Sequence, residues 1–145
     1  MAATVQPRRD ISRIEDYLEA MYNLDREKGY ITTSDISERL GVRVATVSSM
    51  VANLAKKGYL THERYRGMRL TEPGAKAARS VVRRHQAIFD FLSMLGIGKE
   101  IAYEDAEGIE HHLHPITISR FEGLVNFLKK NPRDLERIKE DIGGI

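Results

Sequence analysis

Residues 33–58, TSDISERLGVRVATVSSMVANLAKKG, predict two short helices joined by a tight turn. A helix cap is expected within Thr33-Ser34-Asp35, followed by a first helix over 35–40. Gly41 breaks that helix, and a second helix is expected over 44–57. The buried side of the second helix comprises Val47, Met50, Val51 and Leu54. Two short helices at a glycine turn are typical of the helix-turn-helix arrangement.

The outer side of the second helix carries side chains suited to reading DNA. They are small or hydrogen-bonding groups that can meet base edges in a major groove, namely Arg43, Thr46, Ser49 and Asn53. A plain helical hairpin would show the same apolar spacing. The segment that follows therefore decides between the two interpretations.

A β-hairpin is expected directly after the second helix. Residues 59–64 and 68–71 flank Tyr65-Arg66-Gly67, which places a glycine in the turn. Basic side chains gather on this wing and at the preceding helix end, where they can grip phosphates: Lys56, Lys57, Arg64, Arg66 and Arg69. Glu63 is the single acid between Arg39 and Arg69. This imbalance favours a winged helix-turn-helix that binds nucleic acid.

The segment before the helix-turn-helix is expected to be a short arm over residues 1–9 and then a helix over 10–27. The buried stripe of that helix is Ile11, Ile14, Leu18, Met21 and Tyr22. Asp16 and Glu19 lie one turn apart on another face, and taken alone they indicate only a solvated surface. Residues 30–32 should be extended.

A long helix is expected from Pro73 to Leu95, ended by Gly96. Its apolar line is Ala78, Val81, Val82, Ile88, Phe89 and Leu92, and His85 falls within it. A histidine at that place is either a core residue bonded to a neighbour or a ligand. The solvent side of the long helix is expected to carry Arg79, Arg83 and Arg84. The apolar length of the helix exceeds what a small winged domain needs, which favours a helix-to-helix dimer contact.

An acidic run lies between Glu100 and His112, with five acids and no base. If the run is helical, Glu107, Glu110 and His111 share one face and suit a divalent cation. A solvated acidic helix start is the alternative, because acids favour the first turn. The helix should begin near Ala102 and stop before His114-Pro115. Thr117 is the expected cap of a last amphipathic helix to Lys130, and residues 135–142 should form a short helical tail.

Composition excludes several classes of protein. The 145 residues include no cysteine, which excludes disulfides, thiolate zinc sites and cysteine nucleophiles. No apolar run is long enough to span a bilayer, and the N-terminus has no apolar signal core, so we expect a cytoplasmic protein without a membrane partner. The net charge is only +2, with basic and acidic regions set apart, which suggests two sites with different partners.

Four motifs in order carry a resemblance to a known family. They are Glu15-Asp16-Tyr17-Leu18-Glu19, residues 65–71 (YRGMRLT), Arg84-His85 and residues 107–112 (EGIEHH). With these motifs the chain resembles the diphtheria toxin repressor family of metal-dependent transcription regulators, in its manganese transport regulator branch. Acids at the Asp16 and Glu107 positions mark that branch. The recognition helix starts Arg43-Val44-Ala45-Thr46, without the proline often found there, so no DNA sequence preference carries over.

The resemblance implies a mainly α protein that is not an enzyme. It would have a winged helix-turn-helix DNA-binding domain at 10–72 and a helical metal-binding and dimerisation domain at 73–145. The implied metal ligands are Asp16, Glu19, His85, Glu107, Glu110 and His111. They would hold one or two Mn²⁺ or Fe²⁺ ions per subunit, between the two domains. The implied partners are a double-stranded DNA operator and a second copy of the chain, and the implied role is repression of metal-uptake genes.

Two other functions remain open at the level of sequence. A winged-helix regulator that ignores metal would keep the DNA-binding face and leave the acids as solvated surface. A di-metal carboxylate enzyme would need a Glu-x-x-His motif on each of two helices. The chain has Glu-x-x-Glu-His once, and catalysis would leave the basic wing unexplained.

Overall fold

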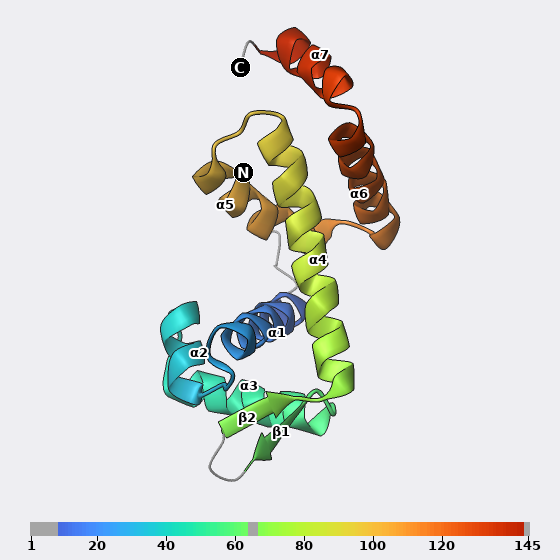
Figure 1. Ribbon diagram of the computed structural model, residues 1–145. Helices are drawn as coiled ribbons and strands as arrows, with labels where there is room; N and C mark the ends of the chain where they lie inside the picture. The colour runs from blue at the N-terminus through green and yellow to red at the C-terminus, as the bar shows by residue number, and fades with distance from the viewer. Residues whose placement is uncertain (1–8, 64–66, 144–145) are drawn as a thin grey trace, which may run out of the picture. The chain divides into compact units, whose positions relative to one another are not determined.

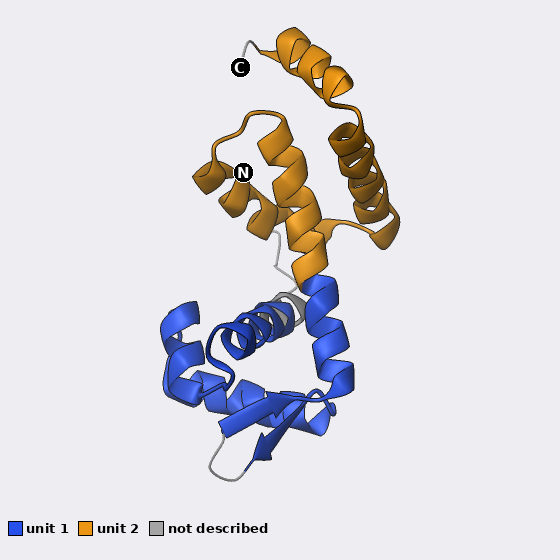
Figure 2. Cartoon of the chain, viewed as in Figure 1, with its two compact units in different colours: residues 1–81 blue, residues 82–145 orange. Residues whose placement is uncertain are grey.

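The computed structural model describes residues 9–63 and 67–143, with side chains from Ile14 onward. The chain divides into two compact units, which we call unit 1 (residues 1–81) and unit 2 (residues 82–145) (Figure 2). The predicted fold class is confirmed, since helices dominate and the only sheet of the described residues is a two-stranded antiparallel hairpin. No helix in the described ranges is long and apolar enough to cross a membrane.

Unit 1 contains a helix-turn-helix followed by a wing (Figure 1). Its elements are α1 (Arg9–Lys28), α2 (Thr33–Leu40), α3 (Val44–Lys56), β1 (Leu60–Glu63), β2 (Gly67–Leu70) and the first part of α4 (Glu72–Met94). The two strands pair antiparallel, with Leu60 opposite Leu70 and Glu63 opposite Gly67. Residues 64–66, between the strands, lie outside the described residues, and so do residues 1–8 of the predicted arm.

The helix ends in the helix-turn-helix follow capping chemistry, with one correction. The hydroxyl of Thr32 accepts a hydrogen bond from the Asp35 backbone N–H at 3.1 Å, so Thr32 caps α2. The expected cap within residues 33–35 was therefore wrong by one residue, because Thr33 is already helical. Gly41 ends α2 in the left-handed region, with a φ of 64°, as expected of a glycine turn.

The core of unit 1 draws on every element of the unit. Its buried side chains are Tyr17, Leu18, Met21, Leu24, Ile31, Ile36, Val47, Val51, Leu54, Leu60, Met68 and Ala78. Most of the predicted apolar positions are confirmed, although Ile14, Tyr22 and Met50 are only partly buried. The predicted extended piece is also confirmed, since Ile31 forms bridges with Gly67 and Met68. Ile11 was predicted in the stripe of α1, and its side chain lies outside the described residues.

Unit 2 is helical throughout its described residues. It contains the second part of α4, α5 (Lys99–Ile109), a 3₁₀ turn η1 (Glu110–His112), α6 (Pro115–Lys130) and α7 (Pro132–Ile142). The helix cap predicted at Thr117 was wrong, because α6 already begins at Pro115 with His114 before it. Proline suits a first helical position, where its missing N–H has no intrahelical partner. The tail helix likewise begins at a proline, before the predicted start at 135.

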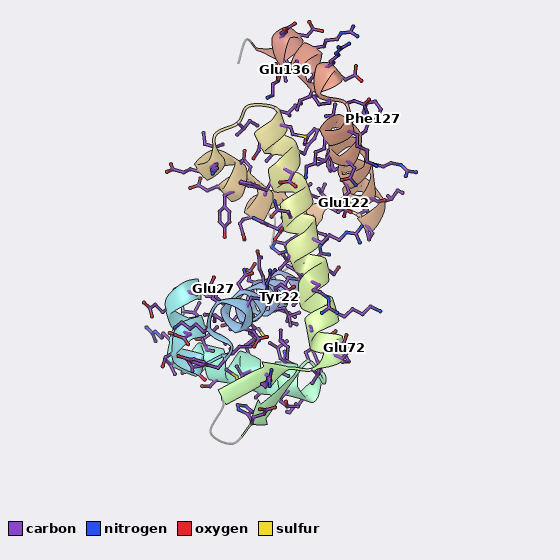
Figure 3. The ribbon with its side chains drawn as sticks, viewed as in Figure 1. Tyr22, Glu27, Glu72, Glu122, Phe127 and Glu136 are labelled. Carbon is purple, nitrogen blue, oxygen red and sulfur yellow. The ribbon has the colours of Figure 1, made fainter. Side chains whose placement is uncertain are left out.

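The core of unit 2 is smaller and is supported by polar contacts on its surface. Its main cluster consists of Ala87, Ile88, Ala106 and Ile118, with Phe89, Leu92, Leu113 and Phe121 packed against it. Arg83 of α4 donates through Nε, at 2.9 Å, to Glu122 of α6, which is labelled in Figure 3. The ring of Phe91 packs on that of Phe121, with centroids 4.7 Å apart. Arg84 is partly buried, so its prediction as a solvent-side residue was wrong, whereas Arg79 and Arg83 are exposed.

Candidate metal centre

Unit 2 brings together four of the predicted ligands, which we call the donor cluster: His85, Glu107, Glu110 and His111. Nδ1 of His85 lies 3.4 Å from Oε1 of Glu107 and 3.2 Å from Oε2 of Glu110. Nε2 of His111 lies 3.3 Å from Oε1 of Glu110. His85 comes from α4 and the other three from the end of α5 and η1, so helix packing joins residues far apart in sequence.

The acidic run changes from an α-helix to a 3₁₀ turn within the donor cluster. The α-helix ends at Ile109, and residues 110–112 continue as a 3₁₀ turn. The predicted run is therefore helical throughout, and the Glu110 N–H still donates to the carbonyl of Ala106, four residues back. Glu107 and Glu110 are three residues apart at the end of α5, so their side chains lie on the same side before the chain turns towards His114-Pro115.

Glu110 is the central residue of the donor cluster. Its side chain is fully buried, and within the described residues neither carboxylate oxygen has a hydrogen-bond partner. The imidazole nitrogens of His85 and His111 lie close to these oxygens, but outside hydrogen-bonding geometry. A buried carboxylate in such surroundings costs several kcal/mol unless positive charge compensates it. Carboxylate oxygens and imidazole nitrogens are donors that divalent transition metals take up, so the donor cluster fits such an ion.

Aromatic rings hold the imidazole of His85 in place. The edge of Tyr103 meets the ring of His85 at a centroid distance of 4.9 Å, and Phe89 stacks at 6.4 Å. His85 is buried, and its Nδ1 lies near the carboxylates of Glu107 and Glu110. The sequence did not single out these two aromatic residues for that role. A signal was present, because Tyr103 precedes Glu107 by one helical turn.

The other two predicted ligands belong to unit 1. Asp16 and Glu19 lie three residues apart on α1, so their side chains project from one side of that helix. Their role as ligands stays a prediction, and it rests on the family motif.

The predicted DNA-binding residues of α3 and its ends are exposed. Arg43, Thr46, Ser49, Asn53, Lys56 and Lys57 all face solvent, and Arg69 does so on β2. The opposite side of α3 is buried through Val47, Val51 and Leu54, which fixes the outward direction of the polar side. Arg64 and Arg66 lie outside the described residues. Contact with DNA stays a prediction for all nine residues.

Comparison with known proteins identifies the two parts of the chain. Residues 11–68 match the family model "Iron dependent repressor, N-terminal DNA binding domain", and residues 71–139 match "Iron dependent repressor, metal binding and dimerisation domain". The chain is 42% identical over 126 residues to the HTH-type transcriptional regulator MntR of Lysinibacillus sphaericus (strain C3-41), covering 87% of this chain and 91% of that protein.

Solved structures agree with this match. The structure of the manganese regulator SloR superposes with a TM-score of 0.69 at 30% identity, over 79% of this chain. A manganese-dependent transcriptional repressor in complex with manganese superposes with a TM-score of 0.68 at 28% identity. This chain spans only about half of those two solved chains, 54% and 53% respectively.

A winged helix-turn-helix unit and a helical unit with a buried carboxylate–imidazole cluster together define a metal-dependent DNA-binding transcription regulator. The chain belongs to the iron dependent repressor family. The family resemblance drawn from the four motifs is thereby confirmed, and so is the expectation of a regulator rather than an enzyme.

Proposed function

We propose that the chain is a homodimeric repressor of metal-uptake genes that binds its DNA operator when Mn²⁺ or Fe²⁺ is bound. The ligands in this proposal are Asp16, Glu19, His85, Glu107, Glu110 and His111, which hold one or two ions per subunit. The observation that carries it is the buried Glu110 carboxylate, which has two imidazole nitrogens beside it and no hydrogen bond within the described residues.

The donor chemistry supports manganese or iron. Four carboxylates and two imidazoles form a mostly hard donor set, which suits Mn²⁺ or Fe²⁺ in high coordination. Of the two structural relatives named above, SloR is a manganese regulator and the other repressor was solved in complex with manganese. Zn²⁺ and Co²⁺ should also occupy the site in vitro, because intrinsic affinity follows the metal series rather than the biological choice.

Electrostatics gives the switch its physical basis. Asp16 and Glu19 carry negative charge on α1, and they repel the carboxylates of the donor cluster when these approach without a cation. A bound divalent ion supplies the positive charge and the coordination that make such an approach favourable. The ligands on both units then hold the recognition helices in one arrangement. In a two-fold dimer this arrangement must match half-sites about one DNA turn apart, so restricting it raises operator affinity.

A dimer contact is supported by the family model and by the surface of unit 2. The matched domain is described as a dimerisation domain. Large apolar side chains remain exposed on α5 and α6, including Ile101, Tyr103, Ile116 and Phe127, the last of which is labelled in Figure 3. The sequence predicted this contact on the long helix α4, whose Phe91 packs within unit 2 against Phe121. Because the exposed apolar side chains named above lie on α5 and α6, we extend the proposed dimer surface to these two helices.

The test is operator binding by the full chain at fixed salt, titrated anaerobically with Mn²⁺ and Fe²⁺ and repeated in EDTA. Salt must be fixed because phosphate contacts make DNA affinity strongly salt-dependent. Promoter fragments of candidate metal transporters and of the chain's own gene serve as probes. We expect metal to tighten binding about tenfold, which corresponds to about 1.4 kcal/mol of coupling. Glu110→Gln should abolish that gain.

Glu104→Gln is the matched control, because it removes one carboxylate from the same acidic run at an exposed position of α5. It should behave like the wild type. Equally tight binding in metal and in EDTA would favour the metal-independent regulator instead. Absence of any operator preference would contradict DNA regulation itself.

A further inference from the structure

The end of the recognition helix α3 and the start of α4 meet at four residues, Gly58, Tyr59, Thr71 and Gly74, which we call the α3–α4 latch. The hydroxyl of Thr71 donates to the carbonyl of Gly58 at 2.5 Å. The backbone N–H of Thr71 donates to the carbonyl of Tyr59 at 3.0 Å. The backbone N–H of Gly74 donates to the same Thr71 hydroxyl oxygen at 3.1 Å. All four residues belong to unit 1.

The latch joins two helix caps through one hydroxyl. At the end of α3, Gly58 has a φ of 80°, and Tyr59 N–H donates to the Leu54 carbonyl at 3.0 Å, which closes a Schellman-type cap. At the start of α4, Thr71 acts as the N-cap by accepting from Gly74 N–H. The Thr71 hydroxyl therefore serves both helices at once. It connects them directly, without passing through the wing strands between them.

Gly74 makes this contact close. The residue is buried, and a Cβ atom added to it would lie 1.8 Å from the carbonyl oxygen of Tyr59. Since that neighbour is backbone rather than a flexible side chain, no other residue fits without separating α4 from Tyr59. The first turn of α4 thus rests directly on the chain that leaves the recognition helix.

The helix fixed in this way also carries a residue of the donor cluster. α4 runs without interruption from Glu72 to Met94, and His85 lies eleven residues beyond Gly74, about 16 Å along a helix. We infer that Thr71 and Gly74 are positioning residues for the recognition helix. They fix α3 to α4, so that ordering of α4 by metal at His85 is passed on to the DNA-reading face. This inference rests on the proposed metal-dependent function.

The test compares Thr71→Val, which keeps the shape but removes the hydroxyl, with Thr71→Ser, which keeps the hydroxyl. For each protein, Mn²⁺ affinity is measured without DNA, and operator affinity is measured with Mn²⁺ and in EDTA. Thr71→Val should bind Mn²⁺ within twofold of the wild type and lose at least two thirds of the metal-induced gain in DNA affinity. Thr71→Ser should restore that gain. Ser80→Ala, at an exposed position of α4, is the matched control and should change neither quantity.

A second readout uses the wild-type chain and needs no variant to fold. Mass-spectrometric hydrogen exchange with and without Mn²⁺ should show slower exchange in peptides that contain the latch amides of Gly58, Tyr59, Thr71 and Gly74. Unchanged exchange there would overturn the inference. Thr71→Val with a full metal-induced gain, or with equal losses of DNA affinity in Mn²⁺ and in EDTA, would overturn it too. If the wild-type chain showed no metal-induced gain in DNA affinity, the proposed function would be contradicted, and the inference that rests on it would fall as well.

Discussion

The two units differ in what fills their interiors. Unit 1 packs twelve buried apolar side chains, drawn from all of its elements, into one cluster. The main cluster of unit 2 has four, and three of these are alanine or isoleucine residues on α4 and α5. Unit 2 also buries His85 and Glu110, the two buried polar residues of the described part of the chain.

This difference separates two ways of holding a fold together. Buried apolar area stabilises unit 1 without any ligand, at about 25 cal/mol per Å² removed from water. In unit 2 part of the interior is given to a carboxylate and imidazoles, which stabilise the fold only when their charges are balanced. Apolar packing in the DNA-reading unit and buried polar groups in the other unit agree with the proposed division between DNA binding and metal sensing.

The largest expected effect is a loss of stability in unit 1, whose core is apolar. Leu54 is fully buried in the core of unit 1, so Leu54→Ala should lower the free energy of unfolding by about 2–5 kcal/mol. Urea unfolding followed by circular dichroism at 222 nm measures this loss, with and without Mn²⁺. Mn²⁺ should not repair the packing defect. The control is Val44→Ala at an exposed position of α3 in the same unit, where a comparable loss of stability would contradict the role given to burial.

The next effect concerns unit 2, which contains the donor cluster. Mn²⁺ at a hundredfold excess over its dissociation constant should stabilise the wild type by about 2.7 kcal/mol. Glu110→Gln should lose most of that stabilisation, because the amide carries no negative charge and keeps only one of the two buried oxygens. Thermal unfolding in Mn²⁺ and in EDTA measures both values. Full stabilisation of Glu110→Gln by Mn²⁺ would place the ion elsewhere.

Two glycine substitutions, one in each unit, should have smaller effects on stability and of opposite sign. Gly67 has a φ of 73°, and a Cβ there would lie 2.5 Å from the Ile31 carbonyl oxygen, so Gly67→Ala should destabilise by about 1–3 kcal/mol. Gly123 lies within α6 with open space around it, so Gly123→Ala should stabilise by about 0.5–1 kcal/mol. The urea midpoints of the two variants measure these changes in stability. If both variants were destabilised, or both stabilised, the packing described for one of the two glycines would be contradicted.

The smallest effect is electrostatic and lies on the surface of unit 1. Hydrogen bonds from Lys28 and then Thr32 hold the pKa of Asp35 below its ordinary range. A lowered pKa stabilises the fold above the unfolded value of about 4, and this contribution is lost as the pH falls through the folded pKa. The wild type should therefore exceed Asp35→Asn in stability at pH 7, and the gap should close below about pH 4. A gap that does not change with pH would contradict this origin.

Sequence reasoning recovered most of the fold because apolar spacing and glycine stops are local signals. Leu18, Met21, Val47 and Leu54 were all placed in the core from spacing alone. It failed where neighbouring residues could each begin a helix, as Thr32 and Thr33 could for α2, and Pro115 and Thr117 for α6. It also gave no sign of the 3₁₀ turn over residues 110–112, or of the burial of the Glu110 carboxylate, which depends on how the surrounding helices pack. The role of the Thr71 hydroxyl was not predicted either, because it depends on how the ends of α3 and α4 meet.

The most direct test of the proposed metal bridge is the Mn²⁺ affinity of a variant that changes only unit 1, Asp16→Asn with Glu19→Gln. Both substitutions leave the donor cluster of unit 2 untouched, and Asp25→Asn on the same helix α1 serves as the control. If ligands from α1 complete the site, the double variant should bind Mn²⁺ at least tenfold more weakly, while the control keeps wild-type affinity. Wild-type affinity in the double variant would mean that unit 2 holds the ion alone, and it would contradict a metal bridge between the units.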